Sequence, residues 1–106
     1  MTLATIREDL KDIRYYYSRQ KVFDKALISV GENIISAKIK RYNDAIRQAP
    51  PRLYDLYVSL YLENNTQDSL SEKLGYTVET ISRLNSQLVR FFQKTLVGEE
   101  VWFYYN

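Results

Sequence analysis

Gly75 lies between two stretches with helical spacing, and this arrangement constrains the fold more than any other feature of the sequence. Before it, Leu70 and Leu74 are four residues apart, which predicts that they share one face of a short helix beginning at Gln67. Glycine adopts a left-handed backbone without steric cost and is therefore typical of the residue at which a helix ends. We expect a short helix, a tight turn and a second helix within residues 66–90.

The residues around Gly75 supply the remaining signals that such a joint needs. Thr66 and Thr77 can cap the two helices, because a threonine hydroxyl accepts an amide hydrogen of the first turn. We expect Tyr76 to enter the core at the turn and the small Ser71 to lie where the second helix approaches. In that second helix one stripe is apolar, formed by Ile81, Leu84, Leu88 and Phe91. The opposite face is polar: Glu79, Thr80, Arg83, Ser86, Gln87 and Arg90.

The order threonine, aliphatic residue, Leu-Gly, threonine, glutamate, isoleucine resembles the promoter-reading helix-turn-helix in region 4 of bacterial sigma factors. The run from Gln67 through Lys73, Leu74 and Gly75 is also similar to phage repressor helix-turn-helices. With the upstream helix, the two prolines and the helix at 53–62, residues 35–95 are similar to small phage-encoded, ArpU-like regulators. The resemblance implies a sequence-specific DNA-binding regulator of transcription encoded by a phage or mobile element. Val78 and Ser82 stand where sigma factors usually carry arginines, so the resemblance implies no particular promoter sequence.

A helix of this type reads bases through side chains in the major groove. Arg83 is the first candidate, because a guanidinium group can bind guanine at two points. The secondary base-reading candidates are Glu79, Thr80, Ser86 and Gln87. The phosphate candidates are Thr66, Gln67, Thr77 and Arg90, since amides at a helix start attract anions. Arg90 has an equally plain interpretation as an ordinary surface residue.

Upstream, apolar residues again recur at helical spacing. Leu3, Ile6, Leu10, Ile13 and Tyr17 predict an amphipathic N-terminal helix, with Thr5 and Glu8 as its capping box. Its stripe is either part of the core or a dimer arm. A short helix containing Val22, Phe23, Leu27 and Val30 is expected next. Ser29 and Glu32 then form a second capping pair, which opens a long helix to about Gln48 with the stripe Ile35, Ile39, Tyr42, Ile46 and Ala49.

Pro50 should end that helix, and Pro51 is suited to the first turn of the next one. The helix at 53–62 is apolar on more than one side, with the main stripe Leu53, Leu56, Tyr57 and Leu60, so we place it at the centre of the fold. Five tyrosines on or beside apolar stripes are expected to pack in the core rather than stack on bases: Tyr42, Tyr54, Tyr57, Tyr61 and Tyr76. Gly98 should end the second helix of the pair at about Val97, followed by an aromatic tail that packs on the protein or on a second subunit.

The predicted fold is therefore all-α: a helical bundle whose N-terminal amphipathic helices precede a C-terminal helix-turn-helix. We expect a single domain over residues 1–106, comprising an N-terminal helical arm at 1–49, the helix-turn-helix unit at 52–97 and the tail at 98–106.

The inventory of side chains excludes several kinds of chemistry. With no cysteine and no histidine, the chain forms neither disulfides nor zinc fingers and has no histidine-based catalysis. Three glycines leave no glycine-rich phosphate loop, so we expect no enzyme, cofactor or metal. Because no run of about 18 apolar residues occurs, we expect a cytoplasmic protein that is neither secreted nor membrane-spanning.

The charge of the chain gives the weakest support for DNA binding. The net charge is +2, and residues 66–106 contain four basic and five acidic residues. The basic side chains gather instead in Lys38, Lys40, Arg41, Arg47 and Arg52, offset in sequence by Asp44, and this run is either a solvated helix face or a phosphate contact. The alternative function is a helical protein-interaction module, such as a polymerase-binding factor or phage packaging adaptor. The expected partners are duplex DNA, RNA polymerase, and a second copy bound through the N-terminal helix or the tail.

Overall fold

The computed structural model describes the backbone of residues 1–19 and 30–105 and the side chains of residues 1–19 and 35–96. The described chain is helical, with no strand, which confirms the all-α prediction. The elements are α1 (Leu3–Ser18), α3 (Val30–Ile46), α4 (Pro51–Tyr57), a π-helical segment η1 (Val58–Leu62), α5 (Gln67–Leu74) and α6 (Val78–Tyr105). The helix predicted around Phe23 and the capping residue Ser29 lie outside the described residues, and the side chain of Glu32 is not described.

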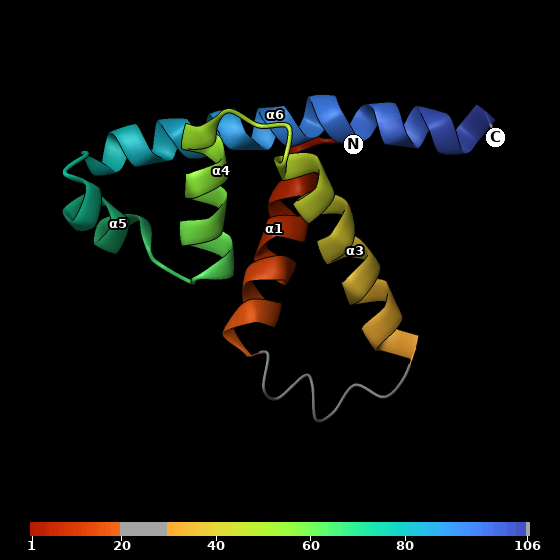
Figure 1. The fold of residues 1–106 in the computed structure, drawn as a ribbon, viewed down its shortest axis with the longest axis horizontal. Helices are drawn as coiled ribbons and strands as arrows, with labels where there is room; N and C mark the ends of the chain where they lie inside the picture. Colours follow the sequence, from red (N-terminus) through yellow and green to blue (C-terminus); the bar gives the residue numbers. More distant parts are fainter. Residues whose placement is uncertain (20–29, 106) are drawn as a thin grey trace.

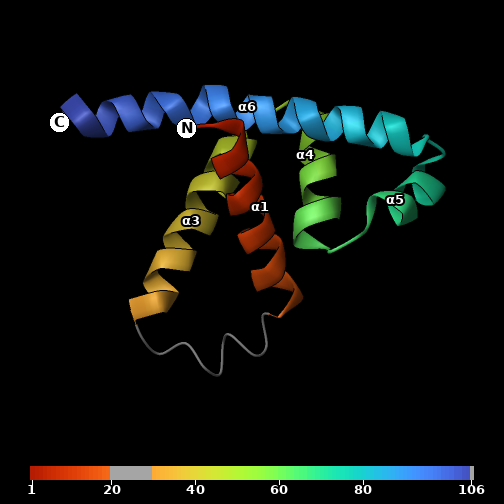
Figure 2. The same cartoon turned by 180° about the vertical axis from the view of Figure 1, so that it is seen from behind.

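The long helix α6 organises the fold. Figure 1 shows α1, α3 and α4 lying against one side of α6, with α5 folded back beside its N-terminal end, and each of the four contacts α6. Seen from behind in Figure 2, the last turns of α6 extend past the other helices. Helix α1 also contacts η1 and α3, so its apolar stripe is buried within the chain. Near its start, the Met1 carbonyl accepts a hydrogen bond from Gln93 Nε2 at 3.2 Å, which ties the first residues to α6.

Capping residues set where the helices begin. The Thr2 hydroxyl accepts the amide hydrogen of Thr5 at 3.0 Å, so α1 begins at Leu3. The predicted capping box of Thr5 and Glu8 is wrong by one turn, because Thr2 offers the same hydroxyl earlier in the chain. Glu8 instead lies 3.9 Å from Lys11 on the exposed face of α1.

The prolines act as the sequence predicts. The chain leaves α3 after Ile46 through two turn hydrogen bonds, and Pro50 has an extended backbone with ψ 147°. Pro51 is the first residue of α4, where its missing amide hydrogen costs nothing. At the other end of this helix, Glu63 N donates to Val58 O at 2.8 Å, which is the wider turn of a π-helix.

Most of the predicted stripes form one core. Its members include Ile6, Leu10 and Ile13 from α1, Tyr42 from α3, Leu53, Leu56, Tyr57 and Leu60 from α4 and η1, and Ile81, Leu84 and Leu88 from α6. Phe91 is only partly buried, whereas its neighbour Phe92 is fully buried. The ring centroid of Phe92 lies 4.9 Å from that of Tyr42 and 5.5 Å from that of Tyr57, so this phenylalanine packs α6 against both α3 and α4.

Three predicted core residues lie at the surface. Leu74 is 53% exposed, Tyr76 45% and Tyr54 43%, so the prediction that each is buried is wrong. Helix α5 has only eight residues and packs on α6 and η1 through Leu70, which leaves Leu74, one turn further on, without a covering helix. Tyr76 follows the left-handed joint, and the turn directs it away from that contact.

The prediction that α6 ends at Gly98 is also wrong. The helix continues to Tyr105, so the backbone of residues 98–105 is helical and continuous with α6. A glycine inside a helix costs about 1 kcal/mol relative to alanine, which is too little to stop a long helix by itself. None of the described helices combines the length and apolar character needed to cross a membrane.

Candidate nucleic-acid interface

The joint between α5 and α6 is built by local hydrogen bonds. Thr66 Oγ1 accepts from Ser69 N at 3.0 Å, and Thr77 Oγ1 accepts from Thr80 N at 3.1 Å, which confirms both predicted caps. Gly75 ends α5 in the left-handed conformation, with φ 72° and ψ 15°, and its amide donates to Ser71 O at 2.9 Å. The Ser71 hydroxyl also donates to the carbonyl of Tyr76. The three-residue turn is therefore fixed on both sides.

The exposed side of α6 carries the base-reading candidates. Glu79, Arg83 and Gln87 are exposed, while Thr80 and Ser86 are half-buried. Within the residues whose side chains are described, Arg83 forms neither an ion pair nor a hydrogen bond, and its guanidinium group is free to bind a ligand. Thr80 is less available, because its hydroxyl lies 2.9 Å from that of Thr77.

The phosphate candidates lie on three parts of the joint. Thr66 and the half-buried Gln67 stand at the start of α5, Thr77 stands in the turn, and Arg90 lies two turns beyond Arg83 on α6. The hydroxyls of Thr66 and Thr77 are used as caps, so their contribution to an anion site is limited to backbone amides and remaining lone pairs. Arg90 is exposed and, like Arg83, has no ionic partner among the described side chains.

A buried amide anchors the inner side of α6. Asn85 is 8% exposed, and its Oδ1 accepts a hydrogen bond from the Tyr61 hydroxyl of η1 at 2.6 Å. Burial raises the pKa of Tyr61, so the phenol stays protonated and able to donate. We did not single out Asn85 from the sequence, although its position four residues after Ile81 placed it beside the apolar stripe. This pair holds the orientation of α6 and thus of its exposed face.

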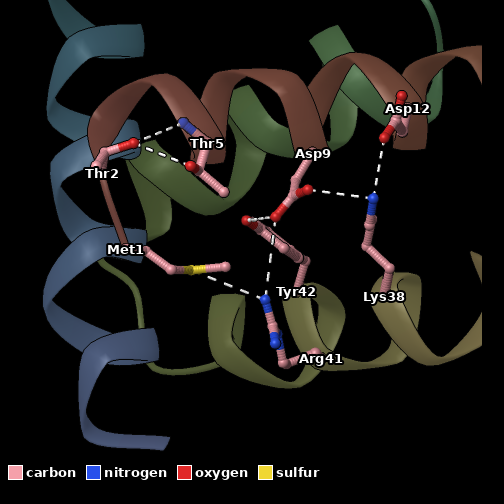
Figure 3. A network of polar contacts seen from close by, with 8 residues as sticks. All are labelled: Met1, Thr2, Thr5, Asp9, Asp12, Lys38, Arg41 and Tyr42. Carbon is pink, nitrogen blue, oxygen red and sulfur yellow. Dashed lines mark hydrogen bonds and ion pairs between the residues drawn. The ribbon is translucent and has the colours of Figure 1, made fainter. Parts of the chain in front are cut away.

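A second polar cluster joins α1 to α3 (Figure 3). The buried carboxylate of Asp9 accepts a hydrogen bond from the Tyr42 hydroxyl at 2.6 Å and lies 3.1 Å from Lys38 Nζ. Arg41 Nη2 is 4.0 Å from the same carboxylate. Lys38 also donates to Asp12 at 2.9 Å, and this hydrogen bond is the main reason that the pKa of Lys38 is raised. Burial raises the pKa of Tyr42.

These ion pairs correct the interpretation of the basic run at 38–52. Asp44 does pair with Lys40 at 2.6 Å, and this contact lowers the pKa of Asp44. In addition, Asp9 and Asp12 of α1 lie within ion-pair distance of Lys38, so carboxylates distant in sequence also offset the run. Among its five cations, Arg47 and Arg52 are exposed and have no ion pair with a described residue. Lys38 and Arg41 thus serve the contact between α3 and α1, Lys40 pairs within α3, and Arg47 and Arg52 face solvent.

The described side chains contain no group of three or more acidic residues that could hold a metal ion. Comparison of the chain with protein-family models, curated proteins and solved structures finds no match. The candidate site therefore rests on the geometry of α5, the turn and α6.

Proposed function

We propose that this protein binds duplex DNA in a sequence-specific manner and regulates transcription, with α5 and α6 acting as a helix-turn-helix and α6 lying in the major groove. One observation carries the proposal. A helix held by a left-handed glycine joint and two threonine caps presents a polar face on which Arg83, Gln87 and Arg90 are exposed and have no partner among the described side chains. A helix that reads bases needs such side chains to be exposed and uncommitted.

Each exposed side chain on this face has a distinct chemical use. Arg83 can donate two hydrogen bonds to O6 and N7 of guanine, a contact that discriminates against other bases by about 1–3 kcal/mol. Gln87 can bind adenine in a similar way, and Glu79 can accept from the amino group of cytosine. Arg90 and the amides at the start of α5 are suited to phosphates, which position the protein without reading sequence.

The modest positive charge limits how much of the affinity comes from phosphates. On the described part of α6, three basic side chains, Arg83, Arg90 and Lys94, accompany one acid, Glu79. With two or three phosphates neutralised, the logarithm of the affinity should fall against the logarithm of salt concentration with a slope of about −2 to −3. Binding should therefore rest on base contacts more than is usual for small DNA-binding proteins.

The proposal is tested by selecting bound duplexes from a random pool and then titrating variants on the selected site. Arg83→Ala should reduce affinity for the selected site by roughly 5- to 150-fold and relax the preference at one base pair. Arg90→Ala should weaken all sequences alike and make the salt slope shallower by about 1. Arg19→Ala is the matched control, because Arg19 is an exposed arginine that follows the last residue of α1 and belongs to neither α5 nor α6. If neither Arg83→Ala nor Arg90→Ala changes DNA affinity at low salt, the groove assignment is wrong.

A second candidate function is a protein-interaction module in which the same helices serve as a scaffold. The exposed apolar side chains of Leu74 and Tyr76 and the balanced charge of residues 66–106 favour it. Its partner would be RNA polymerase or a phage packaging protein. Retention of such a protein on the immobilised chain, without any shift of duplex DNA, would support this function over DNA binding. A palindromic consensus from the pool would instead support a two-fold dimer on DNA.

A further inference from the structure

Apolar side chains are concentrated at the surface of the joint between α5 and α6. Among the large apolar side chains exposed in the described part of the chain, three lie within residues 74–78: Leu74 at 53%, Tyr76 at 45% and Val78 at 43%. Exposed apolar groups that gather in one place usually mark a surface that binds something.

This exposure is a property of a well-fixed backbone. Leu70 and Ile81, 3% and 0% exposed, fill the contact between α5 and α6. The Thr77 cap and the left-handed Gly75 then set the direction in which α6 begins. Val78 is the first residue of α6, so its side chain is held at the surface by the same hydrogen bonds that build the turn.

Val78 is also continuous with the candidate reading face. Glu79 and Ser82, which follow it by one residue and by one helical turn, are both exposed. A reading helix contacts base edges mainly with residues near its N-terminal end. The 5-methyl group of thymine is the apolar group that base pairs display in the major groove, and small apolar side chains recognise it.

We propose that Val78 contacts the methyl group of a thymine, so that the recognised site contains a T·A pair at a fixed distance from the base pair read by Arg83. This inference rests on the proposed function and adds a specific base to it. Arg83 is five positions after Val78, which is about 7.5 Å along a helix. Because base pairs rise by about 3.4 Å, the thymine should lie roughly two base pairs from that position.

The experiment replaces single thymines of the selected site with deoxyuridine, which lacks only the methyl group and keeps every hydrogen-bonding group. For the wild-type protein, one such replacement should weaken binding about fourfold, the effect of burying one methyl group. Val78→Ala should bind the thymine and deoxyuridine duplexes equally well. Val78→Thr, which keeps a methyl group at nearly the same place, should retain part of the preference. Tyr54→Ala removes a side chain that is equally exposed, at 43%, but lies on α4, and it should keep the full fourfold preference.

The outcomes separate the two proposals. Binding that depends on Arg83 but is insensitive to deoxyuridine at every thymine overturns the role of Val78 and leaves the proposed function standing. The role of Val78 is likewise overturned, and the proposed function stands, if deoxyuridine weakens binding equally for Val78→Ala and for the wild-type protein. A protein that shifts no duplex from the pool overturns both the DNA-binding function and the thymine contact. Circular dichroism of each variant shows whether its fold is intact. If Val78→Ala does not fold, Val78→Thr replaces it as the test variant.

Discussion

The joint at Gly75 leads to a prediction whose size can be worked out, because only the backbone is involved. Gly75 has φ 72°, and a Cβ atom placed on it would have no other atom within 4 Å. Alanine therefore meets no steric obstacle from its neighbours and feels only the cost of the left-handed conformation, about 1–2 kcal/mol. Alanine also lowers the conformational entropy of the unfolded chain, which stabilises the folded protein by about 0.4–1 kcal/mol. Gly75→Ala should thus lower the free energy of unfolding by about 0.5–1 kcal/mol, within outer limits of about 0 and 1.6 kcal/mol.

Two further variants make this prediction specific. Gly75→Asn should cost less than Gly75→Ala, because asparagine adopts the left-handed conformation more readily. Gly98→Ala should have the opposite sign, because the backbone at Gly98 is part of the continuous helix α6, where alanine is favoured over glycine by about 1 kcal/mol. The same substitution at two glycines should destabilise the protein at one and stabilise it at the other.

The assay is urea denaturation followed by circular dichroism, with thermal unfolding as a second measurement. A change of about 0.5–1 kcal/mol should move the melting temperature by roughly 2–8 °C in a domain of this size. A Gly75→Ala variant that is more stable than the wild-type protein would contradict the left-handed joint. A decrease in the free energy of unfolding of more than about 3 kcal/mol would instead contradict the open space around the Cβ position of residue 75.

Two more predictions concern the polar cluster between α1 and α3 and the buried tyrosines. Asp9→Asn should lower the free energy of unfolding by about 2–3 kcal/mol, because it removes a buried charge that binds Tyr42 and Lys38. Asp12→Asn changes a more exposed partner of the same lysine and should lower it by less than about 1 kcal/mol. Urea denaturation of both variants checks this, and equal losses would refute it. Stability should also fall as the pH rises above about 10. The pKa of Lys38 is raised from 10.5, and burial raises the pKa values of Tyr42, Tyr57 and Tyr61 from 10.0. At high pH the unfolded chain therefore releases protons that the folded chain keeps, which favours unfolding. A urea midpoint that does not change between about pH 8 and about pH 11 would contradict those shifts.

The parts of the fold that the sequence predicts well are those decided by neighbouring residues. Thr66, Gly75 and Thr77 act on amides within a few positions of themselves, so their roles were predictable without knowledge of the rest of the chain. The same holds for Pro51 at the start of α4. Because these signals set the ends of α5 and α6, the exposed polar face of α6 could also be predicted.

The features that the sequence did not predict depend on distant parts of the chain. Nothing near Asp9 in the sequence indicates that it is buried, because Lys38 and Tyr42, which explain its burial, lie about thirty residues further on. Leu74 had the spacing of a core residue, but spacing does not say whether a neighbouring helix extends far enough to cover it. The exposure of Tyr76, which was also expected in the core, was missed for the same reason.

The contact between α1 and α6 has a consequence for how the chain is made. Ile6, Leu10 and Ile13 reach full burial only when the later helices that contact α1, α6 included, have been made, and the Met1 carbonyl accepts a hydrogen bond from Gln93 near the far end of the sequence. With roughly 80 residues still to be added after Ile13, a ribosome working at about 5–20 residues per second leaves these side chains in water for roughly 4–16 s. During that interval the nascent chain exposes an apolar helix that chaperones and proteases can recognise, and synthesis of α6 ends it.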